Sequence, residues 1–156
     1  MMLCKIPLAQ FLNHSLNKKL WILIFRLIHW CHGAPGAIHL FIKAYQVFES
    51  EEYIEAAKKC ADVIWYRGLL KKGYGLCHGI AGNTYAFLAL CQATNEVEYL
   101  VKAEKFVEFM FDYDEHLERT PDRPYSLFEG IAGTIYLLDD MEKHPMKATF
   151  PGFYVF

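Results

Sequence analysis

Hydrophobic residues recur at intervals of three and four along most of the chain, which is the period of a helix with one face in a core. Five segments show this period, and no stretch shows the sustained alternation of a strand. The segments lie after Gly36 as far as Phe48, over "EEYIEAAKKCADVIWYRG" (51–68), after Gly82, from Tyr99 to Met110, and over "GTIYLLDDM" (133–141). The pattern predicts an all-α protein, with Gly68 where the second helix ends.

A glycine motif precedes three of these helices. "CHGAPG" at 31–36, "CHGIAG" at 77–82 and "FEGIAG" at 128–133 share Gly-x-x-Gly and are separated by 46 and 51 residues. Such spacing is typical of helical-pair repeats, in which a loop, an inner helix, a connector and an outer helix form one unit. The glycines would permit close backbone contact and positive φ. Repeats bury their flanks only against neighbours, so about two and a half units leave an open edge.

Composition narrows the class of protein. A chain of 156 residues suits one domain, and 54% hydrophobic residues indicate a folded core. A net charge of -2 offers no electrostatic footprint for nucleic acid. Five cysteines without the dense spacing of a secreted scaffold favour a reducing compartment, so we expect a cytoplasmic protein. The apolar run "LWILIF" is much shorter than the ~20 residues of a membrane span and is interpreted as part of a buried helix.

The repeated Cys-His-Gly is the candidate chemistry. Thiolate and imidazole are the donors that zinc prefers, and a catalytic zinc keeps one position open beside about three protein ligands. The residues alone also allow a closed structural site made of Cys31, His32, Cys77 and His78. A single cysteine in a reducing compartment is commonly a buried, inert thiol. Two copies in matching repeat positions favour a metal site.

Several long stretches occur in an order that resembles one known family. "HWCHGAPG", "LLKKGYGLCHGIAGNTYAFL", "RTPDRPYSLFEGIAGTIYLL" and "KATFPGFYVF" resemble the C-terminal part of the eukaryotic LanC-like proteins, relatives of bacterial lanthionine synthetase cyclases. The resemblance covers residues 27–156, and residues 1–26 are predicted to be an atypical lead outside it. It implies a double α/α toroid of seven helical hairpins around a zinc ion, of which this chain resembles about the last three.

The resemblance also implies ligands and a reaction. The zinc ligands of the family fall on Cys31, Cys77 and His78, and His32 is left out. Zinc lowers the pKa of a bound thiol from about 8.5. The thiolate then adds to the β-carbon of a dehydroalanine or dehydrobutyrine residue. For the eukaryotic proteins the implied thiol is glutathione and the implied acceptors are dehydroamino-acid-containing proteins, a glutathione transferase-like activity.

Four further residues belong to the predicted site. Lys72 and Arg119 match the family's glutathione contacts, and cationic side chains suit the two carboxylates of glutathione. A solvated surface cation is the alternative for both, and it is the interpretation preferred for Lys71. His32 is a candidate for orienting the loop or the thiol, and an ordinary loop histidine is the alternative. Glu129 could accept a hydrogen bond or a proton, although stabilisation of a helix N-terminus is the leading interpretation.

The addition also needs a proton donor. In the family this is a histidine, assisted by an aspartate, from repeats that precede "HWCHGAPG". His14 and His29 lack the surrounding motif, so no catalytic residue is assigned to this chain. Two hypotheses follow: an enzyme portion whose activity is impaired, or a non-catalytic module that binds zinc, glutathione or a protein. Self-association through the open toroid edge and peripheral contact with the plasma membrane are further candidate interactions.

Overall fold

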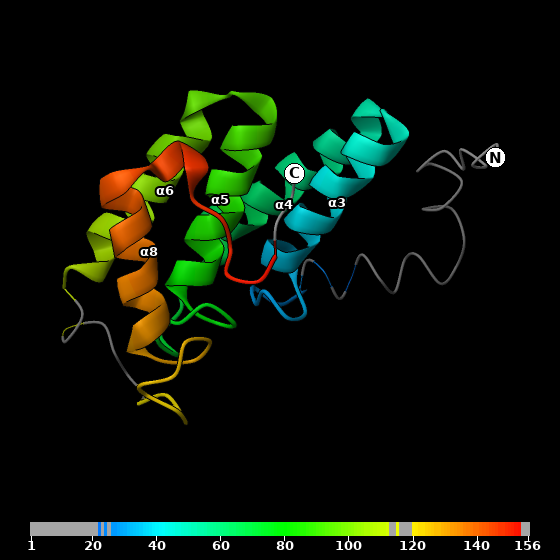
Figure 1. The fold of residues 1–156 in the computed structure, drawn as a ribbon. Helices are drawn as coiled ribbons and strands as arrows, with labels where there is room; N and C mark the ends of the chain where they lie inside the picture. Colours follow the sequence, from blue (N-terminus) through cyan, green and yellow to red (C-terminus); the bar gives the residue numbers. More distant parts are fainter. Residues whose placement is uncertain (1–21, 23, 25, 113–114, 116–119, 154–156) are drawn as a thin grey trace.

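The computed structural model describes residues 22, 24, 26–112, 115 and 120–153, and these residues are helical with no strand (Figure 1). The predicted all-α class is confirmed, and Gly68 caps the second predicted helix at its C-terminus. The elements are α3 (Ala34–Phe48), α4 (Glu51–Arg67), α5 (Ile80–Thr94), α6 (Val97–Met110), α8 (Ile131–Lys143) and the 3₁₀ turn η1 (Pro145–Lys147).

The helices follow the predicted repeat. Helix α3 packs on α4 and α5 packs on α6, so each pair is a hairpin, and α5 also contacts α3, α4 and α8. Helices α3, α5 and α8 each start at the same end of the molecule, where the glycine loops lie (Figure 1). The chain therefore forms part of an α/α toroid. None of the described helices combines the length and the apolar character that a membrane crossing needs.

Burial is concentrated in α5. Eleven of its fifteen residues are buried, whereas only three of the thirteen residues of α8 are. Helix α5 lies between α3 and α8, with α4 and α6 behind it, so nearly every side of it meets protein. Phe87 illustrates this, since its ring is fully buried and packs edge-on against Phe106 of α6 at 5.1 Å. This central helix holds the second glycine loop in place.

The glycine pairs act through close contact. A Cβ atom built on Gly36 would lie 2.0 Å from the carbonyl oxygen of Trp30, and one on Gly82 would lie 1.9 Å from that of Leu76. The expected positive φ is wrong for the first glycine of each pair, which is extended, with φ of 169°, -137° and -113°. The helices also begin directly after that first glycine, earlier than the hydrophobic period predicted. Glycine is needed here because the helix start touches the backbone of its own loop.

The C-terminal segment returns across the inner helices to the glycine loops. After η1 it runs along α5 toward the loop before α3 (Figure 1). The amide of Gln92 in α5 donates to the carbonyl of Ala148 at 2.8 Å. Phe150 then stacks on Trp30, with ring centroids 4.3 Å apart and planes 6° from parallel. We refer to residues 148–153 as the strap, and its aromatic residues fix the loop that carries Cys31.

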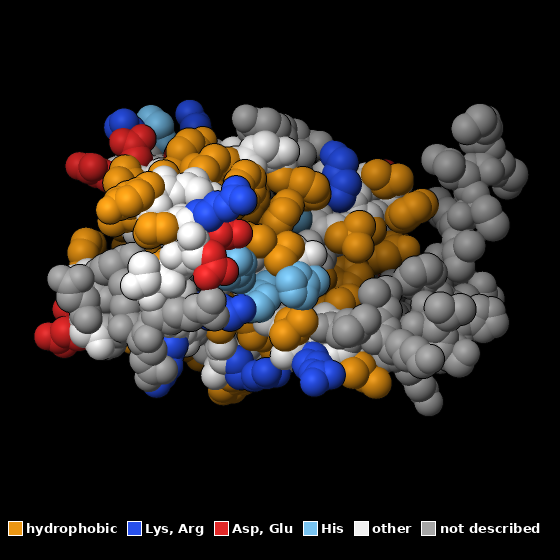
Figure 2. All heavy atoms as spheres, turned by 90° about the horizontal axis from the view of Figure 1, so that it is seen from below, with side chains coloured by type: hydrophobic (Ala, Val, Ile, Leu, Met, Phe, Trp, Pro, Cys, Tyr) orange, Lys and Arg blue, Asp and Glu red, His pale blue; other side chains and the backbone are white. Residues whose placement is uncertain are grey.

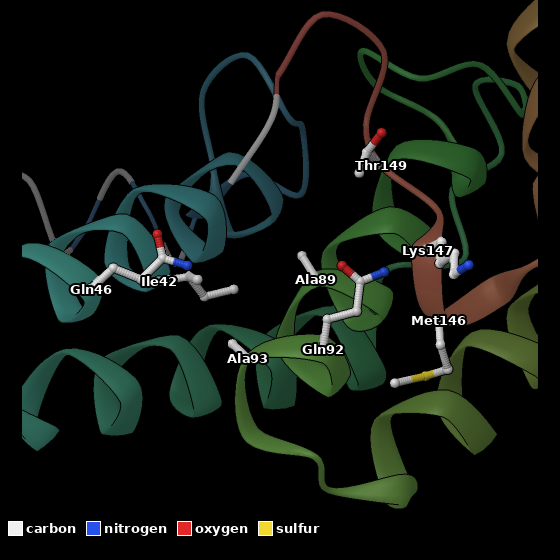
Figure 3. A pocket seen from close by; sticks show the side chains of 8 residues that line it. All are labelled: Ile42, Gln46, Ala89, Gln92, Ala93, Met146, Lys147 and Thr149. Atoms are coloured by element: carbon white, nitrogen blue, oxygen red, sulfur yellow. The ribbon is translucent and has the colours of Figure 1, made fainter. Parts of the chain in front are cut away.

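A pocket of about 500 Å³ lies beside the strap, away from the glycine loops. Figure 3 shows that it is bordered by the C-terminal halves of α3 and α5 and by the chain around η1. Its most central polar group, the amide of Gln92, already donates to the carbonyls of Ala148 and Pro145. The described residues that line it include no Cys, His, Asp or Glu. The pocket therefore lacks the chemistry that the sequence predicts, and the candidate site lies at the other end of the helices.

Candidate functional site

The three glycine loops are joined by backbone hydrogen bonds. The amide of Trp30 donates to the carbonyl of Cys77 at 2.7 Å, and the amide of Cys77 donates to the carbonyl of Phe128 at 2.7 Å. Residues 77 and 128 occupy the same position in their loops, two before the first glycine. The repeat therefore places corresponding backbone segments side by side, and it brings residues that are 46 positions apart in the chain into one cluster.

Cys31 and Cys77 meet at this junction. Both are free thiols, and Cys31 is exposed while Cys77 is half-buried. Burial, together with a hydrogen bond to the Cys31 side chain, raises the pKa of the Cys77 thiol to about 11. The negative charge of Glu129 is the smallest contribution to this raised pKa, and it puts that carboxylate within electrostatic reach of Cys77. Without a cation, Cys77 is thus a protonated thiol at neutral pH.

Histidine side chains surround the cysteines. Figure 2 shows them gathered at the centre of the face that carries the glycine loops, with basic and acidic side chains beside them. Cys31 Sγ lies 2.7 Å from Nδ1 of His32, and Nε2 of His32 lies 3.4 Å from Nδ1 of His29. The His29 and His78 rings are 5.5 Å apart. Imidazoles from two loops therefore lie next to each other, and one of the histidines, His32, contacts Cys31.

Lys72 also belongs to this cluster. Burial is the main cause that lowers the pKa of His29 to about 4, and the electrostatic influence of Lys72, His32 and His78 contributes to the same shift. His29 is therefore a neutral imidazole at neutral pH. Lys72 and His78, with Pro121 and Asp122, line a hollow of about 30 Å³, which is the volume of one water molecule.

The structure brings most of the predicted residues together. Cys31, His32, Lys72, Cys77, His78 and Glu129 all lie in or next to the cluster. Arg119 lies outside the described residues, and so does His14. The predicted assignment of Cys31, Cys77 and His78 as the zinc ligands, and of Lys72 and Arg119 as glutathione contacts, stays a prediction.

Sequence reasoning missed the part that His29 plays in the cluster. Within the part of the chain that the structure describes, the ligand group with all atoms inside 4.8 Å consists of His29, Cys31 and His32, and it does not include Cys77 or His78. The sequence alone assigns His29 no role, because the residue lacks the motif of the family's proton donor. The spacing His-x-Cys-His in "HWCH" was the available signal, because a short turn can direct all three side chains to one side.

Comparison with known proteins identifies the family. The family described as lanthionine synthetase C-like protein matches residues 7–155. A zebrafish (Danio rerio) protein named glutathione S-transferase LANCL1 is 54% identical over 129 residues, which are 83% of this chain and 32% of that protein. The chain thus spans about a third of the length of this relative. On the length of the match and the level of identity, this chain belongs to the lanthionine synthetase C-like family.

Proposed function

We propose that this chain is the thiol-activating portion of a zinc-dependent, glutathione transferase-like protein. The single observation that carries the proposal is the meeting of Cys31 and Cys77, held by the hydrogen bond between Trp30 and the Cys77 carbonyl. The name of the zebrafish relative supports glutathione as the thiol. We further propose dehydroalanine- and dehydrobutyrine-containing proteins as acceptors, and the cytoplasm as the location.

The residues present fit a zinc ion. Two thiols in contact, with imidazoles on either side, form the soft donor set that zinc prefers. The Cys77 thiol is protonated because burial and the neighbouring Cys31 oppose a thiolate there, and a divalent cation reverses that balance. Cys31, Cys77 and His78 would hold the ion. Zinc bound there would stabilise the thiolate of a substrate at its open position.

The other residues would position the substrate. The Lys72 ammonium would attract a glutathione carboxylate, and its closeness to His29 and His78 puts that charge beside the proposed ligands. Arg119 would supply a second cation. In the reaction a sulfur–carbon bond forms at the β-carbon of the acceptor, and the α-carbon takes up a proton. We assign the donor of that proton to no residue of this chain.

Zinc affinity tests the ligand assignment. Cys77→Ala removes a thiolate ligand, so we expect the affinity measured by competition with a chromophoric chelator to fall at least about 100-fold. Cys60→Ala is the matched control, because Cys60 is fully buried in α4 and lies outside the cluster. His32→Ala should cost much less than Cys77→Ala. Unchanged zinc binding in Cys77→Ala would refute the assignment, and an equal loss in His32→Ala would support the closed four-ligand site.

Glutathione binding tests the role of Lys72. Lys72→Ala should weaken binding of glutathione to the zinc-loaded chain, measured by calorimetry, by about tenfold because one charge-assisted contact is lost. Lys71→Ala is the matched control, since it removes the same charge one residue away. Equal weakening in the two variants would mean that only the overall charge matters.

An interaction module is the second candidate function. Helix α8 carries an apolar surface in which Ile131, Ile135 and Tyr136 are 38%, 59% and 42% exposed. Exposed apolar patches of this kind mark association surfaces. Thioether formation on a dehydroalanine peptide and sedimentation, measured together for this chain and for a version extended by the family's N-terminal repeats, distinguish the candidates. Activity and a monomeric state that appear only in the extended version favour the enzyme portion.

A further inference from the structure

His29, Cys31 and His32 form a second group of potential metal ligands beside the proposed one. One ligand atom from each lies within 4.8 Å of the others. His29 is half-buried, and Cys31 and His32 are exposed. We name these three residues the outer set, and we name Cys31, Cys77 and His78 the inner set. The two sets share Cys31, so the idea of an outer set rests on the proposed function at that residue.

The separations in the outer set suit one metal ion. Two nitrogen ligands at about 2.0 Å from a tetrahedral zinc are separated by about 3.3 Å. The observed distance between Nδ1 of His29 and Nε2 of His32 is 3.4 Å. The Cys31 sulfur contacts the other nitrogen of His32, Nδ1, at 2.7 Å, and one ligand atom from each of the three residues lies within 4.8 Å of the others. A sulfur–metal bond would replace this hydrogen bond, because metal binding by a cysteine releases the thiol proton.

The loop that carries the outer set is fixed before any metal arrives. The amide of Ala34 donates to the carbonyl of Leu27 at 3.2 Å, which closes the turn around residues 29–32. Trp30, between His29 and Cys31, donates its amide to Cys77 and stacks on Phe150 of the strap. The ligands therefore need little ordering when a metal binds, and this favours affinity at a solvent-facing position.

The two sets are arranged from outside to inside. Cys31 and His32 are exposed, whereas Cys77 is half-buried and its thiol contacts Cys31. The His29 ring faces both His32 and His78, at 5.0 and 5.5 Å between centroids. We propose that His29, Cys31 and His32 bind a divalent, thiophilic cation such as zinc at the surface and pass it to Cys77 and His78 through the shared Cys31 sulfur.

Cobalt(II) is the probe for the outer set, because its thiolate charge-transfer band reports how many cysteines bind it. We expect Cys77→Ser with His78→Ala, made in the full chain, to bind one Co²⁺ with about half the charge-transfer intensity of the unmodified chain. Adding His29→Ala and His32→Ala to that variant should abolish binding. His144→Ala, at an exposed histidine after α8, is the control and should change nothing.

A variant that lacks the two outer-set histidines distinguishes the rate of zinc uptake from the equilibrium affinity for zinc. His29→Ala with His32→Ala keeps the inner set, so we expect zinc transfer from a chromophoric chelator to slow about tenfold while the equilibrium affinity stays nearly constant. Circular dichroism checks that each variant keeps its helices. A normal loading rate, or loss of equilibrium affinity equal to that of the inner-set variant, would overturn the proposed transfer.

The outcomes also separate the outer set from the proposed function. If the inner-set variant binds no Co²⁺ while the unmodified chain shows two thiolates, the outer set is refuted and the inner set stands. If the unmodified chain shows one thiolate and loses Co²⁺ only when His29 and His32 are replaced, the outer set stands and the assignment of Cys77 and His78 is refuted.

Discussion

Helices α5 and α8 share the sequence Gly-Ile-Ala-Gly at their starts, at 79–82 and 130–133, and the first glycine of each is the N-cap. In both, the second glycine touches the carbonyl oxygen six residues earlier, at 1.9 and 2.2 Å from a built Cβ. Their surroundings differ, since α5 is buried on nearly all sides and α8 leaves an apolar face exposed. The shared motif therefore determines the backbone of the loop, whereas the neighbours determine how much of the helix is buried.

The chemistry differs at the two positions before the motif. Cys77 and His78 precede α5, and Phe128 and Glu129 precede α8. The backbone hydrogen bond from Cys77 to Phe128 places these pairs side by side. One loop thus offers metal ligands, and the other offers an aromatic ring and a carboxylate on the same frame. The two residues before the first glycine can therefore differ between repeats, and they can form a site in one loop while the helices stay the same.

The largest effect should come from adding a methyl group to the second glycine. Gly82→Ala puts a Cβ against the carbonyl oxygen of Leu76 inside the core, and neither backbone segment can move. We expect a loss of at least about 3 kcal/mol in the free energy of unfolding, despite the higher helix propensity of alanine. Denaturant unfolding monitored by circular dichroism measures this.

Gly133→Ala sharpens the comparison. Its Cβ would also approach the backbone carbonyl of Leu127 and, at 2.8 Å, the buried Leu76 side chain, but α8 packs against fewer elements than α5 and leaves an apolar face exposed. The cost should therefore be clearly smaller than for Gly82→Ala. Gly152→Ala is the control, because its Cβ meets no atom within 4 Å and only its φ of 78° opposes alanine. Equal costs at positions 82 and 133 would contradict the claim that neighbours matter.

A change in the pH dependence of stability is expected from the third residue after the second glycine of the motif. This residue is His39 in α3, Tyr85 in α5 and Tyr136 in α8. Tyr85 donates to Asp140 at 2.6 Å, and Tyr136 is partly exposed. His39 is 2% exposed, and no described residue gives either ring nitrogen a hydrogen bond; Phe150 and Phe153 of the strap face it instead. Burial lowers its pKa to about 4.

The direction in which stability changes with pH follows from whether the folded or the unfolded chain binds the proton of His39. Above pH 6.5 His39 is neutral whether the chain is folded or not, so it adds no pH dependence. Between pH 6.5 and 4 the unfolded chain binds a proton that the folded chain refuses, and stability falls by about 3 kcal/mol over that range. His39→Phe should remove this part of the pH dependence in denaturant unfolding measured from pH 7 to 4.5. Parallel curves for the two proteins would refute the assignment.

The sequence supplied the helices because their hydrophobic period is regular, and the Cys-His-Gly copies identified most of the cluster. It could not supply the contact of the strap with Trp30, because Phe150 is 120 residues away in a segment without a period. It also missed His29, because the spacing His-x-Cys-His in "HWCH" indicates a ligand group only when the turn directs His29 toward His32. The sequence thus predicts helices from their regular hydrophobic period, but it does not predict where side chains point in irregular loops.

The smallest effect in the series concerns the residue directly after each Gly-Ile-Ala-Gly. Asn83 donates to the carbonyl of Gly68 at 2.7 Å, and Thr134 donates to the carbonyl of Tyr74 at 3.1 Å, so both bind the backbone of the preceding segment. Asn83→Ala should cost about 2 kcal/mol because it leaves a buried carbonyl at the end of α4 without its partner.

Thr134→Val should cost about 1 kcal/mol, because α8 lies at the edge and water can reach the freed carbonyl more easily. Thr84→Val is the control, since the Thr84 hydroxyl donates only within its own helix, to the carbonyl of Ile80. Unfolding of the three variants in urea gives the order. If Thr134→Val cost as much as Asn83→Ala, the hydrogen bond from α8 would contribute as much stability as the one from α5. The two helices would then differ only in how much of their surface is buried.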